Sequence, residues 1–482
     1  MASNLFASWV ADFQARPLPG ITPRTVSLPL LRGKVDALVG MRRVGKTWRV
    51  YQQLAELLDD GVPKERMLYV NLEDERLVGV RAEDLGGLLD AWYARHPSAL
   101  EGERWLCLDE VQNVPGWERF VRRVLDQGDV RLLVTGSSSR MLSEEIATSL
   151  RGRALSTEIL PYSFAEALVH AGQAPPTAWP LATAERARVA HAFEVYFESG
   201  GFPEVQGFPF TPARSGPARP PSAPLPSRIV ARQGPRYPGR KRLDLDTEDL
   251  TARRFDAALR RRVLQEYIDV ALLRDVVERH EVTQVRALRW LVRRLLAHPA
   301  GRFTANRLHR DLKSQGVKIG KDAVHQLVEH VEDAHLLYTV PIWAASFGKR
   351  RANPRKAYPV DPALARTVAF AKPEDVGHRL ETLVYLHLRR RGHAEVGYLE
   401  TASGYEVDFC SRGADGTLAL TQVCAELGAE NTRKRELRAV GEAMAEMGVS
   451  EATLVTVREE EEVRLASGLV RVVPAWRWLL DG

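Results

Sequence analysis

The sequence predicts an α/β protein: a parallel sheet with helices on both faces, followed by a helical domain and a second, smaller α/β domain. Three observations predict this order. Short apolar, β-prone runs alternate with helical patterns over the first 165 residues, a proline-rich basic stretch interrupts the chain, and helical and then strand-like patterns follow it. With 482 residues, the chain has the length of about three domains. We place the boundaries at 1–165 (sheet domain), 166–207 (helical lid region), 208–245 (linker or insertion), 246–375 (helical domain) and 376–482 (C-terminal domain).

The composition excludes several classes of protein. Hydrophobic residues make up 45% of the chain and charged residues 27%, yet no apolar run approaches the roughly 18 residues that span a bilayer. The N-terminus lacks the basic leader and long apolar core of a signal peptide, so we expect a cytoplasmic protein with no membrane partner. Three scattered cysteines, Cys107, Cys410 and Cys424, exclude a disulfide framework and a structural zinc site.

The positive charge is concentrated in one segment. The chain carries +6 overall, but residues 208–242 hold eight basic side chains, nine prolines and no acidic residue, which leaves −2 for the remainder. Such a stretch cannot bury enough apolar surface to offset its ordering entropy. We predict a cationic linker that is either a solubilising spacer or a tether for phosphate backbones. The charge of the whole chain therefore does not by itself predict nucleic-acid binding.

A phosphate-binding loop is the first functional motif. Gly40-Met-Arg-Arg-Val-Gly-Lys-Thr47 has the pattern GxxxxGK[ST], follows a β-prone run at 35–39 and precedes a helical pattern. Glycines let backbone N–H groups point at phosphates, Lys46 reaches the β and γ phosphates, and the Thr47 hydroxyl ligates Mg²⁺. The motif predicts ATP and Mg²⁺ as cofactors. The residues expected to bind the nucleotide are Gly40, Arg43, Val44, Gly45, Lys46, Thr47 and Trp48.

Two carboxylates at the end of an apolar strand complete the predicted catalytic centre. The strand at 105–108 ends in Asp109 and Glu110. A P-loop site needs an acidic metal partner at the end of a neighbouring strand. We therefore predict that Asp109 holds Mg²⁺ through water and that Glu110 polarises the attacking water, which makes Glu110 and Lys46 the candidate catalytic residues.

Three further strands are predicted at 67–72, 130–135 and 154–160, and the helical patterns between them favour a parallel sheet. Gly136-Ser-Ser-Ser139 follows the fourth strand at the carboxyl edge, where ligands bind in such sheets. Ser137 is our candidate for a hydroxyl that senses the γ phosphate. The alternative role of these serines is a helix N-cap, and both roles can hold together.

Six motifs along the chain carry a family resemblance. They are Gly40–Thr47, Leu108-Asp-Glu-Val-Gln-Asn-Val-Pro-Gly-Trp117, Thr135-Gly-Ser-Ser-Ser139, Leu150-Arg-Gly-Arg153, Leu160-Pro-Tyr-Ser-Phe-Ala-Glu166 and Gly200-Gly-Phe-Pro-Glu204. In this order they resemble a prokaryotic AAA-type ATPase family, across nearly the whole chain except the proline-rich insertion. The resemblance implies an ATPase of the additional-strand, catalytic-glutamate class, joined to a C-terminal domain of unknown function known as DUF4143.

An arginine is expected near the transferred phosphoryl group, because its oxygens need cations beyond Lys46 and Mg²⁺. Arg153 is our candidate, with Arg151 behind it. Either could act on the nucleotide of its own chain or of a neighbouring subunit in a homo-oligomer, and the alternative is surface pairing with local carboxylates. The side chains of Arg42 and Arg43 occupy variable positions of the loop motif and have no assigned role.

The helical domain has the order of a winged helix, which the resembling family also has here. A packing helix is predicted within 256–297, two helical patterns at 303–312 and 320–331 follow, and strands at 336–343 and 357–360 flank a wing. The basic wing tip predicts contacts with phosphates of double-stranded or branched DNA, whereas the acidic second helix favours the alternative, a module that contacts protein. The candidate DNA contacts are Lys349, Arg350, Arg351, Arg355 and Lys356.

The C-terminal domain looks like the PD-(D/E)xK nuclease core, with Asp408 and Gln422 on successive strands and Glu381 on the preceding helix. Cys424 stands where the motif has lysine. A thiol cannot replace an ammonium that orients water, and Gln422 is a weaker metal ligand than a carboxylate. We therefore predict a degenerate site in a binding or scaffolding domain. Lys434, on a helix, is the candidate replacement for the missing lysine.

Three functional hypotheses follow. The first is a Mg²⁺-dependent ATPase whose nucleotide state drives a DNA-engaging C-terminal half. The second is a nucleotide-gated switch that binds a protein partner. The third is an active metal-dependent nuclease, which the residues at 422 and 424 disfavour.

Overall fold

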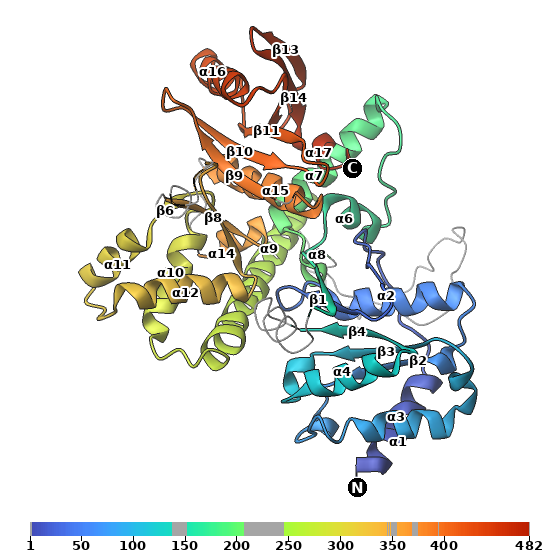
Figure 1. The fold of residues 1–482 in the computed structure, drawn as a ribbon. Coiled ribbons are helices and arrows are strands. Elements are labelled where there is room, and N and C mark those ends of the chain that lie inside the picture. The colour runs from blue at the N-terminus through green and yellow to red at the C-terminus, as the bar shows by residue number, and fades with distance from the viewer. Residues whose placement is uncertain are drawn as a thin grey trace, which may run out of the picture.

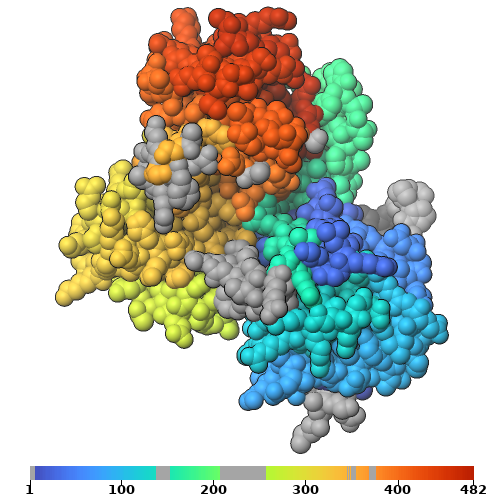
Figure 2. All heavy atoms as spheres, viewed as in Figure 1, coloured from blue at the N-terminus to red at the C-terminus, as the bar shows by residue number. Residues whose placement is uncertain are grey.

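A computed structural model shows the architecture (Figure 1). It describes residues 2–136, 152–206, 245–344, 346, 348, 354–368, 375–393 and 395–481. The N-terminal sheet domain (blue) lies beside a helical domain (yellow) and below a second sheet domain (orange to red). Figure 2 shows the three parts as packed bodies, with the helices that follow the first sheet (green) lying against the C-terminal domain.

The first sheet is parallel throughout, in the order β2-β3-β4-β1-β5. The predicted parallel α/β sheet is thereby confirmed, and β4 lies between β1 and β3. β1 and β3 are buried along their whole length, as expected for apolar strands covered on both faces. The strands are β1 (Val35–Val39), β2 (Met67–Asn71), β3 (Arg104–Asp109), β4 (Val130–Thr135) and β5 (Ala154–Glu158).

Helices cover both faces because alternate residues of each strand point to opposite sides. Leu106 and Leu108 pack on the side of α1, α3 and α4, whereas Trp105 and Cys107 pack on the side of α2. The helices are α1 (Ala2–Ala15), α2 (Lys46–Asp59), α3 (Gly86–Arg95) and α4 (Trp117–Gln127). Single 3₁₀ turns are η1 (Lys64–Arg66), η2 (Glu75–Leu77), η3 (Pro97–Glu101) and η4 (Val111–Asn113).

Three helices follow the sheet: α6 (Phe164–His170), α7 (Thr183–Ser199) and α8 (Pro203–Gln206). α6 begins with a capping box, in which the Ser163 hydroxyl and the Glu166 carboxylate each accept a backbone N–H of the other residue. α7 contacts α14 (Pro362–Val368) and α17 (Ala475–Trp478) of the C-terminal half. These contacts join the two halves, and the predicted lid role of 166–207 stays a prediction.

The helical stretch predicted at 256–297 is divided into three elements. α9 (Leu245–Val270) continues into a π-helix, η5 (Ala271–Glu278), and α10 (Val285–Leu296) follows a break. The break coincides with Glu281, whose φ of 49° lies in the left-handed region, and with the β-branched pair at 282–283. π-Helical turns are frequently found at functional sites.

The next elements are helices and strands in the predicted order, and their assignment as a winged helix stays a prediction. After α10 come β6 (Arg302–Phe303), α11 (Ala305–Ser314), α12 (Lys321–Asp333), β7 (Leu337–Val340) and β8 (Arg355–Pro359). The three strands form an antiparallel sheet in the order β6-β8-β7. The wing tip of the prediction, including Lys349, Arg350 and Arg351, lies outside the described residues.

The C-terminal domain is built on a six-stranded sheet in the order β13-β14-β12-β11-β10-β9. β9, β10 and β11 form an antiparallel meander, and β11, β12 and β14 are parallel neighbours. The helix before the meander and the helix after it pack on the sheet. The elements are α15 (Asp375–Arg390), β9 (Glu395–Glu400), β10 (Glu406–Arg412), β11 (Leu418–Val423), α16 (Glu430–Met447), β12 (Glu451–Thr456), β13 (Glu461–Leu465) and β14 (Gly468–Pro474).

One hydrophobic core continues through the molecule. It runs from the α2 face of the first sheet, through α7, α9 and α10, to α15 and the last helix. The ATP-binding motif is therefore carried on a domain that shares buried surface with the C-terminal half. Among the described residues, no helix is both long and apolar enough to cross a bilayer.

Candidate functional site

The loop between β1 and α2 has the backbone that phosphate binding requires. Gly40, Arg43 and Gly45 all have positive φ, at 144°, 67° and 99°. A Cβ on Gly40 would lie 2.3 Å from the Ile159 carbonyl oxygen, so only glycine fits there. The loop and the first turn of α2, through Trp48, lie at the carboxyl end of β1, and Trp48 is exposed.

Lys46 is buried within this loop. Its ammonium donates hydrogen bonds to the carbonyl oxygens of Gly40 (3.0 Å) and Met41 (3.2 Å). The side chain therefore lies along the inside of the loop, where P-loop lysines reach phosphates. Only 4% of the residue is exposed, and phosphates bound in the loop would compete with these carbonyl oxygens for the ammonium.

Asp109 connects β3 to the loop. The Thr47 hydroxyl and the Tyr69 hydroxyl each donate to Asp109 Oδ2 at 2.7 Å. Burial and the charge of Asp109 raise the pKa of Tyr69, so this phenol stays a donor. The two residues predicted to hold Mg²⁺, Thr47 and Asp109, are thus in direct contact.

Thr135, the last residue of β4, is a site residue that the sequence analysis missed. Its hydroxyl is fully buried, donates to Asp109 Oδ1 and accepts the backbone N–H of Glu110 at 3.0 Å. The available signal was a polar residue ending a strand at the carboxyl edge of the sheet. The prediction instead chose Ser137, which lies outside the described residues, as does Arg151.

Glu110 follows Asp109 in a left-handed conformation, with φ 56° and ψ 50°. This conformation is uncommon for a residue with a side chain and marks functional sites when the surroundings hold it. The bond from Glu110 N–H to Thr135 holds it here, and the Gln112 amide donates to the Glu110 carboxylate. The carboxylate is half-buried at the carboxyl edge of β3.

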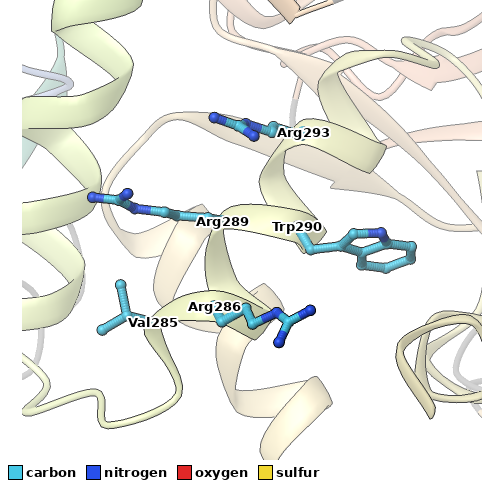
Figure 3. Close-up of a pocket in the computed structure, with 5 residues that line it drawn as sticks. All are labelled: Val285, Arg286, Arg289, Trp290 and Arg293. Carbon is cyan, nitrogen blue, oxygen red and sulfur yellow. The ribbon is translucent and has the colours of Figure 1, made fainter. Parts of the chain in front are cut away.

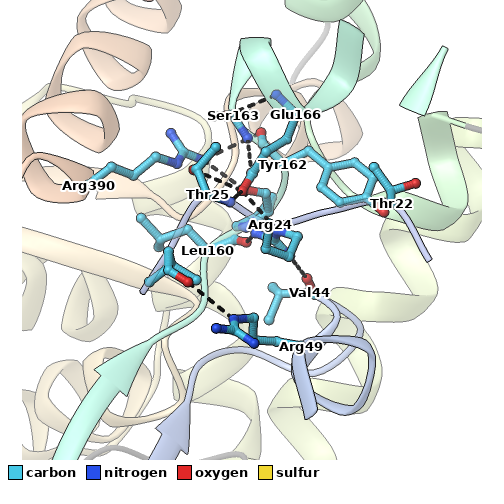
Figure 4. A network of polar contacts seen from close by, with 12 residues as sticks. Thr22, Arg24, Thr25, Val44, Arg49, Leu160, Tyr162, Ser163, Glu166 and Arg390 are labelled. Atoms are coloured by element: carbon cyan, nitrogen blue, oxygen red, sulfur yellow. Dashed lines mark hydrogen bonds and ion pairs between the residues drawn. The ribbon is translucent and has the colours of Figure 1, made fainter. Parts of the chain in front are cut away.

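Arg24, which precedes β1 in the chain, stabilises the loop by contacts with the loop backbone and with neighbouring residues (Figure 4). Its guanidinium donates to the carbonyl oxygens of Val44 (2.8 Å) and Leu160 and pairs with Glu166 at 3.1 Å. Burial opposes ionisation of Glu166, but the charge of Arg24 and backbone N–H donors keep the pKa of this carboxyl below its ordinary value. No sequence motif pointed to Arg24, because its partners are distant in sequence.

The side chains of the two loop arginines, which had no predicted role, make specific contacts. Arg42 Nε lies 3.0 and 3.1 Å from the two carboxylate oxygens of Asp275, a buried residue of η5. Burial lowers the pKa of Arg42, but the charges of Asp275 and Glu110 outweigh it and raise the pKa. Arg43 pairs with Glu204 at 2.9 Å and lies over the ring of Tyr267. The phosphate loop thus touches the helix that leads into the C-terminal half.

Arg153 lies away from this centre. It precedes β5, which runs parallel to β1, and its carbonyl accepts the backbone N–H of Val35 at the amino end of β1. The P-loop begins at the other end of β1, so Arg153 does not reach a nucleotide bound by its own chain. Its side chain pairs with Asp126 at the surface. This is a correction to the prediction of action within the same chain.

Lys356 differs most from the prediction. It was expected on an exposed wing, but only 2% of the residue is exposed. Its ammonium lies 2.7 Å from Glu381, 2.7 Å from Glu406 and 2.9 Å from Asp408. The predicted DNA contact was wrong, because β8 directs this lysine into the acidic cluster of the C-terminal domain. Arg355, its neighbour, is half-exposed and lies 3.1 Å from Thr339 Oγ1.

The predicted nuclease residues do lie together, but internal contacts use their polar atoms. Gln422 accepts the backbone N–H of Asp408 (3.0 Å) and donates to Glu436 (2.6 Å). Burial and the charge of Asp408 raise the pKa of Glu381 to about 8, against the opposing charge of Lys356. Lys434 is exposed and pairs with Glu430 on its own helix, so it does not replace the lysine missing at position 424.

The nucleotide loop fits Mg²⁺-bound ATP. In the described part of the chain, no group of three or more His, Cys, Asp or Glu residues is arranged to hold a metal ion. Mg²⁺ in P-loop sites does not need such a cage, because substrate phosphates and water complete its shell. The Thr47 hydroxyl and the Asp109 carboxylate, 2.7 Å apart beside the glycine loop, are the ligands that the protein would contribute to that shell.

Comparison with known proteins finds a family match for the N-terminal part. The model of an AAA domain matches residues 32–168, a range that holds the whole parallel sheet and the loop. This match supports an AAA-type P-loop domain in this region. A domain of unknown function, DUF8612, matches residues 250–375. The expected DUF4143 domain is not confirmed.

The relatives do not carry a described function. The chain is 29% identical over 466 residues to an uncharacterized protein of Methanocaldococcus jannaschii, covering 95% of this chain and 90% of the relative. It is 25% identical over 405 residues to an uncharacterized protein of Haemophilus influenzae, covering 83% and 85%.

Two solved structures are similar over 76% of this chain. The Walker-type ATPase PABY2304 of Pyrococcus abyssi has 14% identity and a TM-score of 0.39, with 94% of that chain covered. The ORC1 protein of Aeropyrum pernix, in complex with DNA, has 16% identity and a TM-score of 0.23, with 91% covered. Scores this low do not establish a shared arrangement of the whole chain.

Proposed function

We propose that this protein is a Mg²⁺-dependent ATPase that transmits its nucleotide state to a DNA-engaging C-terminal half. One observation carries the ATPase proposal: Lys46, Thr47 and Asp109 converge on the carboxyl ends of β1 and β3. Bound Mg²⁺ supplies charge neutralisation to the phosphates. The position of β4 between β1 and β3 supports the additional-strand class.

Each site residue has a distinct role in this proposal. Backbone N–H groups of the loop and the Lys46 ammonium bind the phosphates. Thr47 and Asp109 hold the metal, with Tyr69 and Thr135 fixing the Asp109 carboxylate. Glu110 orients and deprotonates the attacking water, because its backbone is fixed by Thr135 and its carboxylate is the next acidic group along the edge.

Arg42 is the residue that supports coupling between the phosphate loop and the helical domain. It lies close enough to Glu110 to be influenced by its charge and forms two contacts with Asp275 on η5. η5 in turn contacts α12, and His280, two residues after η5, pairs with Asp333 at 3.2 Å and stacks on His330 of α12. A change of phosphate occupancy in the loop would therefore act on Arg42 and, through η5, on the helical domain.

A nuclease function is disfavoured by charge. The Lys356 ammonium lies among the three carboxylates that a divalent metal would need, and Asp408 and Gln422 are committed to internal hydrogen bonds. The second candidate function remains the nucleotide-gated protein switch. The acidic exposed face of α12, with Asp322 and Glu329, favours it, because a recognition helix of this charge repels phosphates.

Two substitutions test the ATPase site. Lys46→Ala should abolish binding of a fluorescent ATP analogue, whereas Glu110→Gln should retain binding and lose about 100-fold or more of the turnover, the usual contribution of general base catalysis. Lys434→Ala and Glu101→Gln, at exposed positions, are the matched controls. Turnover at the control rate in both site variants would reject the proposal.

A further inference from the structure

Helix α10 exposes a row of arginines that no predicted role includes. Arg286, Arg289 and Arg293 are exposed on one face, while Leu288 and Leu291 on the opposite face are buried in the core. With Val285 and Trp290, these arginines line a surface cavity of about 460 Å³. Figure 3 shows that the side chains of this face diverge, with Arg286 and Trp290 extending in one direction and Arg289 and Arg293 in the other.

These arginines are not explained by folding. Within the described part of the chain, none of the three takes part in an ion pair or a side-chain hydrogen bond, whereas Arg302 and Arg355 of the same domain pair with glutamates. Like charges three and four residues apart on a helix repel each other. The row therefore opposes helix formation slightly and indicates an anionic ligand.

The surroundings are also basic. From 285 to 320, the sequence has nine basic residues and a single acidic one, Asp311. The exposed members on α11 and after it include Arg307, Arg310 and Lys318. The acidic face of α12 repels phosphates, so α10 and α11, rather than α12, carry the positive surface of this domain.

We propose that the α10 surface, defined as Arg286, Arg289, Trp290 and Arg293, binds single-stranded nucleic acid. The three arginines extend over about 10 Å of helix, at 1.5 Å per residue, so they can contact successive phosphates of one strand. Trp290 is half-exposed at the cavity. An unpaired base can stack on its indole, whereas the bases of a duplex are hidden in their own stack.

This inference rests on the proposed DNA engagement of the C-terminal half, and it names the surface and the form of nucleic acid. It does not depend on ATP hydrolysis. Binding is therefore measured without nucleotide, on the full chain and on its Lys46→Ala variant. Loss of turnover with normal nucleic-acid binding, or the reverse, separates failure of the ATPase site from failure of the α10 surface.

The test is fluorescence anisotropy with a labelled 12-nucleotide oligo-dT between 50 and 200 mM salt. Each phosphate contact on a single strand contributes about 0.7 to the slope of log affinity against log salt. Replacing three arginines should therefore lower the slope by about 2 and weaken binding about 20-fold or more at the lower salt. The variants are R286Q/R289Q/R293Q and the stronger R286E/R289E/R293E.

Two controls make the result specific. R95E/R119E/R464E changes the charge equally at exposed arginines outside α10 and should bind like the unsubstituted protein. Trp290→Leu should weaken binding about 5-fold or more with an unchanged salt slope, because stacking releases no counterion. A purely structural role of Trp290 would not give this separation.

Three outcomes would overturn the inference. They are equal binding by the arginine variants and the charge control, equal affinity for oligo-dT and a matched duplex, and equal affinity for oligo-dT and polyglutamate of the same charge. The last result would assign the surface to an acidic protein partner.

Discussion

The contact between Arg42 and Asp275 should be an energetic link between the ATP loop and η5. Arg42 Nε lies 3.0 and 3.1 Å from the carboxylate oxygens, and the side chains are 23% and 2% exposed. Removing one partner of a buried pair costs about 3–5 kcal/mol. We therefore expect Arg42→Met to lower the free energy of unfolding by about 3 kcal/mol, and Asp275→Asn by less, because an amide still accepts a hydrogen bond.

A double-mutant cycle measures the link itself. The double variant R42M/D275N should recover part of the loss, which gives a coupling energy of about 2 kcal/mol by urea unfolding. The surface pair Arg76 and Asp74, at 2.9 Å but 39% and 26% exposed, is the matched control, and its coupling should be below about 1 kcal/mol.

Repeating the cycle with a non-hydrolysable ATP analogue tests transmission. If phosphate in the loop changes the Arg42–Asp275 contact, the coupling energy should shift by about 1 kcal/mol or more, since allosteric coupling is a difference between states. Additive single effects would show that the pair does not stabilise the protein. Equal coupling with and without the analogue would refute transmission and leave the pair a structural contact.

Three further predictions follow from individual residues. Lys356→Met leaves Glu381, Glu406 and Asp408 facing each other without a cation and should cost about 3–5 kcal/mol in urea unfolding, whereas Lys434→Met should leave the midpoint unchanged; equal midpoints would contradict the ion-pair geometry. Burial opposes ionisation of Glu158, but the hydrogen bond from His335 and the charge of Arg389 lower its pKa to about 2, below the ordinary 4.5. This stabilisation, on the order of 3 kcal/mol, is present above pH 4.5 and is lost as the pH falls toward 2, so Glu158→Gln should flatten the acid side of a stability profile and a parallel profile would reject the link. Gly40→Ala should lose ATP binding because its Cβ would lie 2.3 Å from the Ile159 carbonyl, whereas Gly128→Ala, with φ 82° and open space, should retain it; equal affinities would show that the loop relaxes.

The sequence predicted the parts of the site that depend on residues adjacent in the chain. The loop motif from Gly40 to Thr47 and the carboxylates after β3 are contiguous, and their strands are apolar runs bounded by turns. Thr135 was within reach of the same logic, since it ends β4 at the same edge. The prediction did not include Thr135, because the three serines that follow it are more prominent candidates for a hydroxyl ligand than one threonine at the end of a buried strand.

Residues whose role depends on the tertiary fold could not be found in this way. Arg24 meets partners up to about 140 residues away, at Leu160 and Glu166. Lys356 sits among basic residues in sequence, which suggested a solvated wing, but the pairing of β8 with β7 turns it toward carboxylates from α15 and β10. Arg42 occupies a variable position of the loop motif, so its role is evident only from its contact with Asp275 in the structure.

The placement of Lys356 constrains how the C-terminal half can move. β8 belongs to the three-stranded sheet of the helical domain, yet its ammonium is held by Glu381 on α15 and by Glu406 and Asp408 on β10. Separating the two domains would remove the Lys356 ammonium from this cluster. Two or more carboxylates would then remain in a largely buried site without a cation, which costs free energy. A displacement of η5 and α12 should therefore carry the C-terminal sheet with it. The unit that responds to nucleotide would then extend from η5 to the last strands, with the α10 surface fixed upon it.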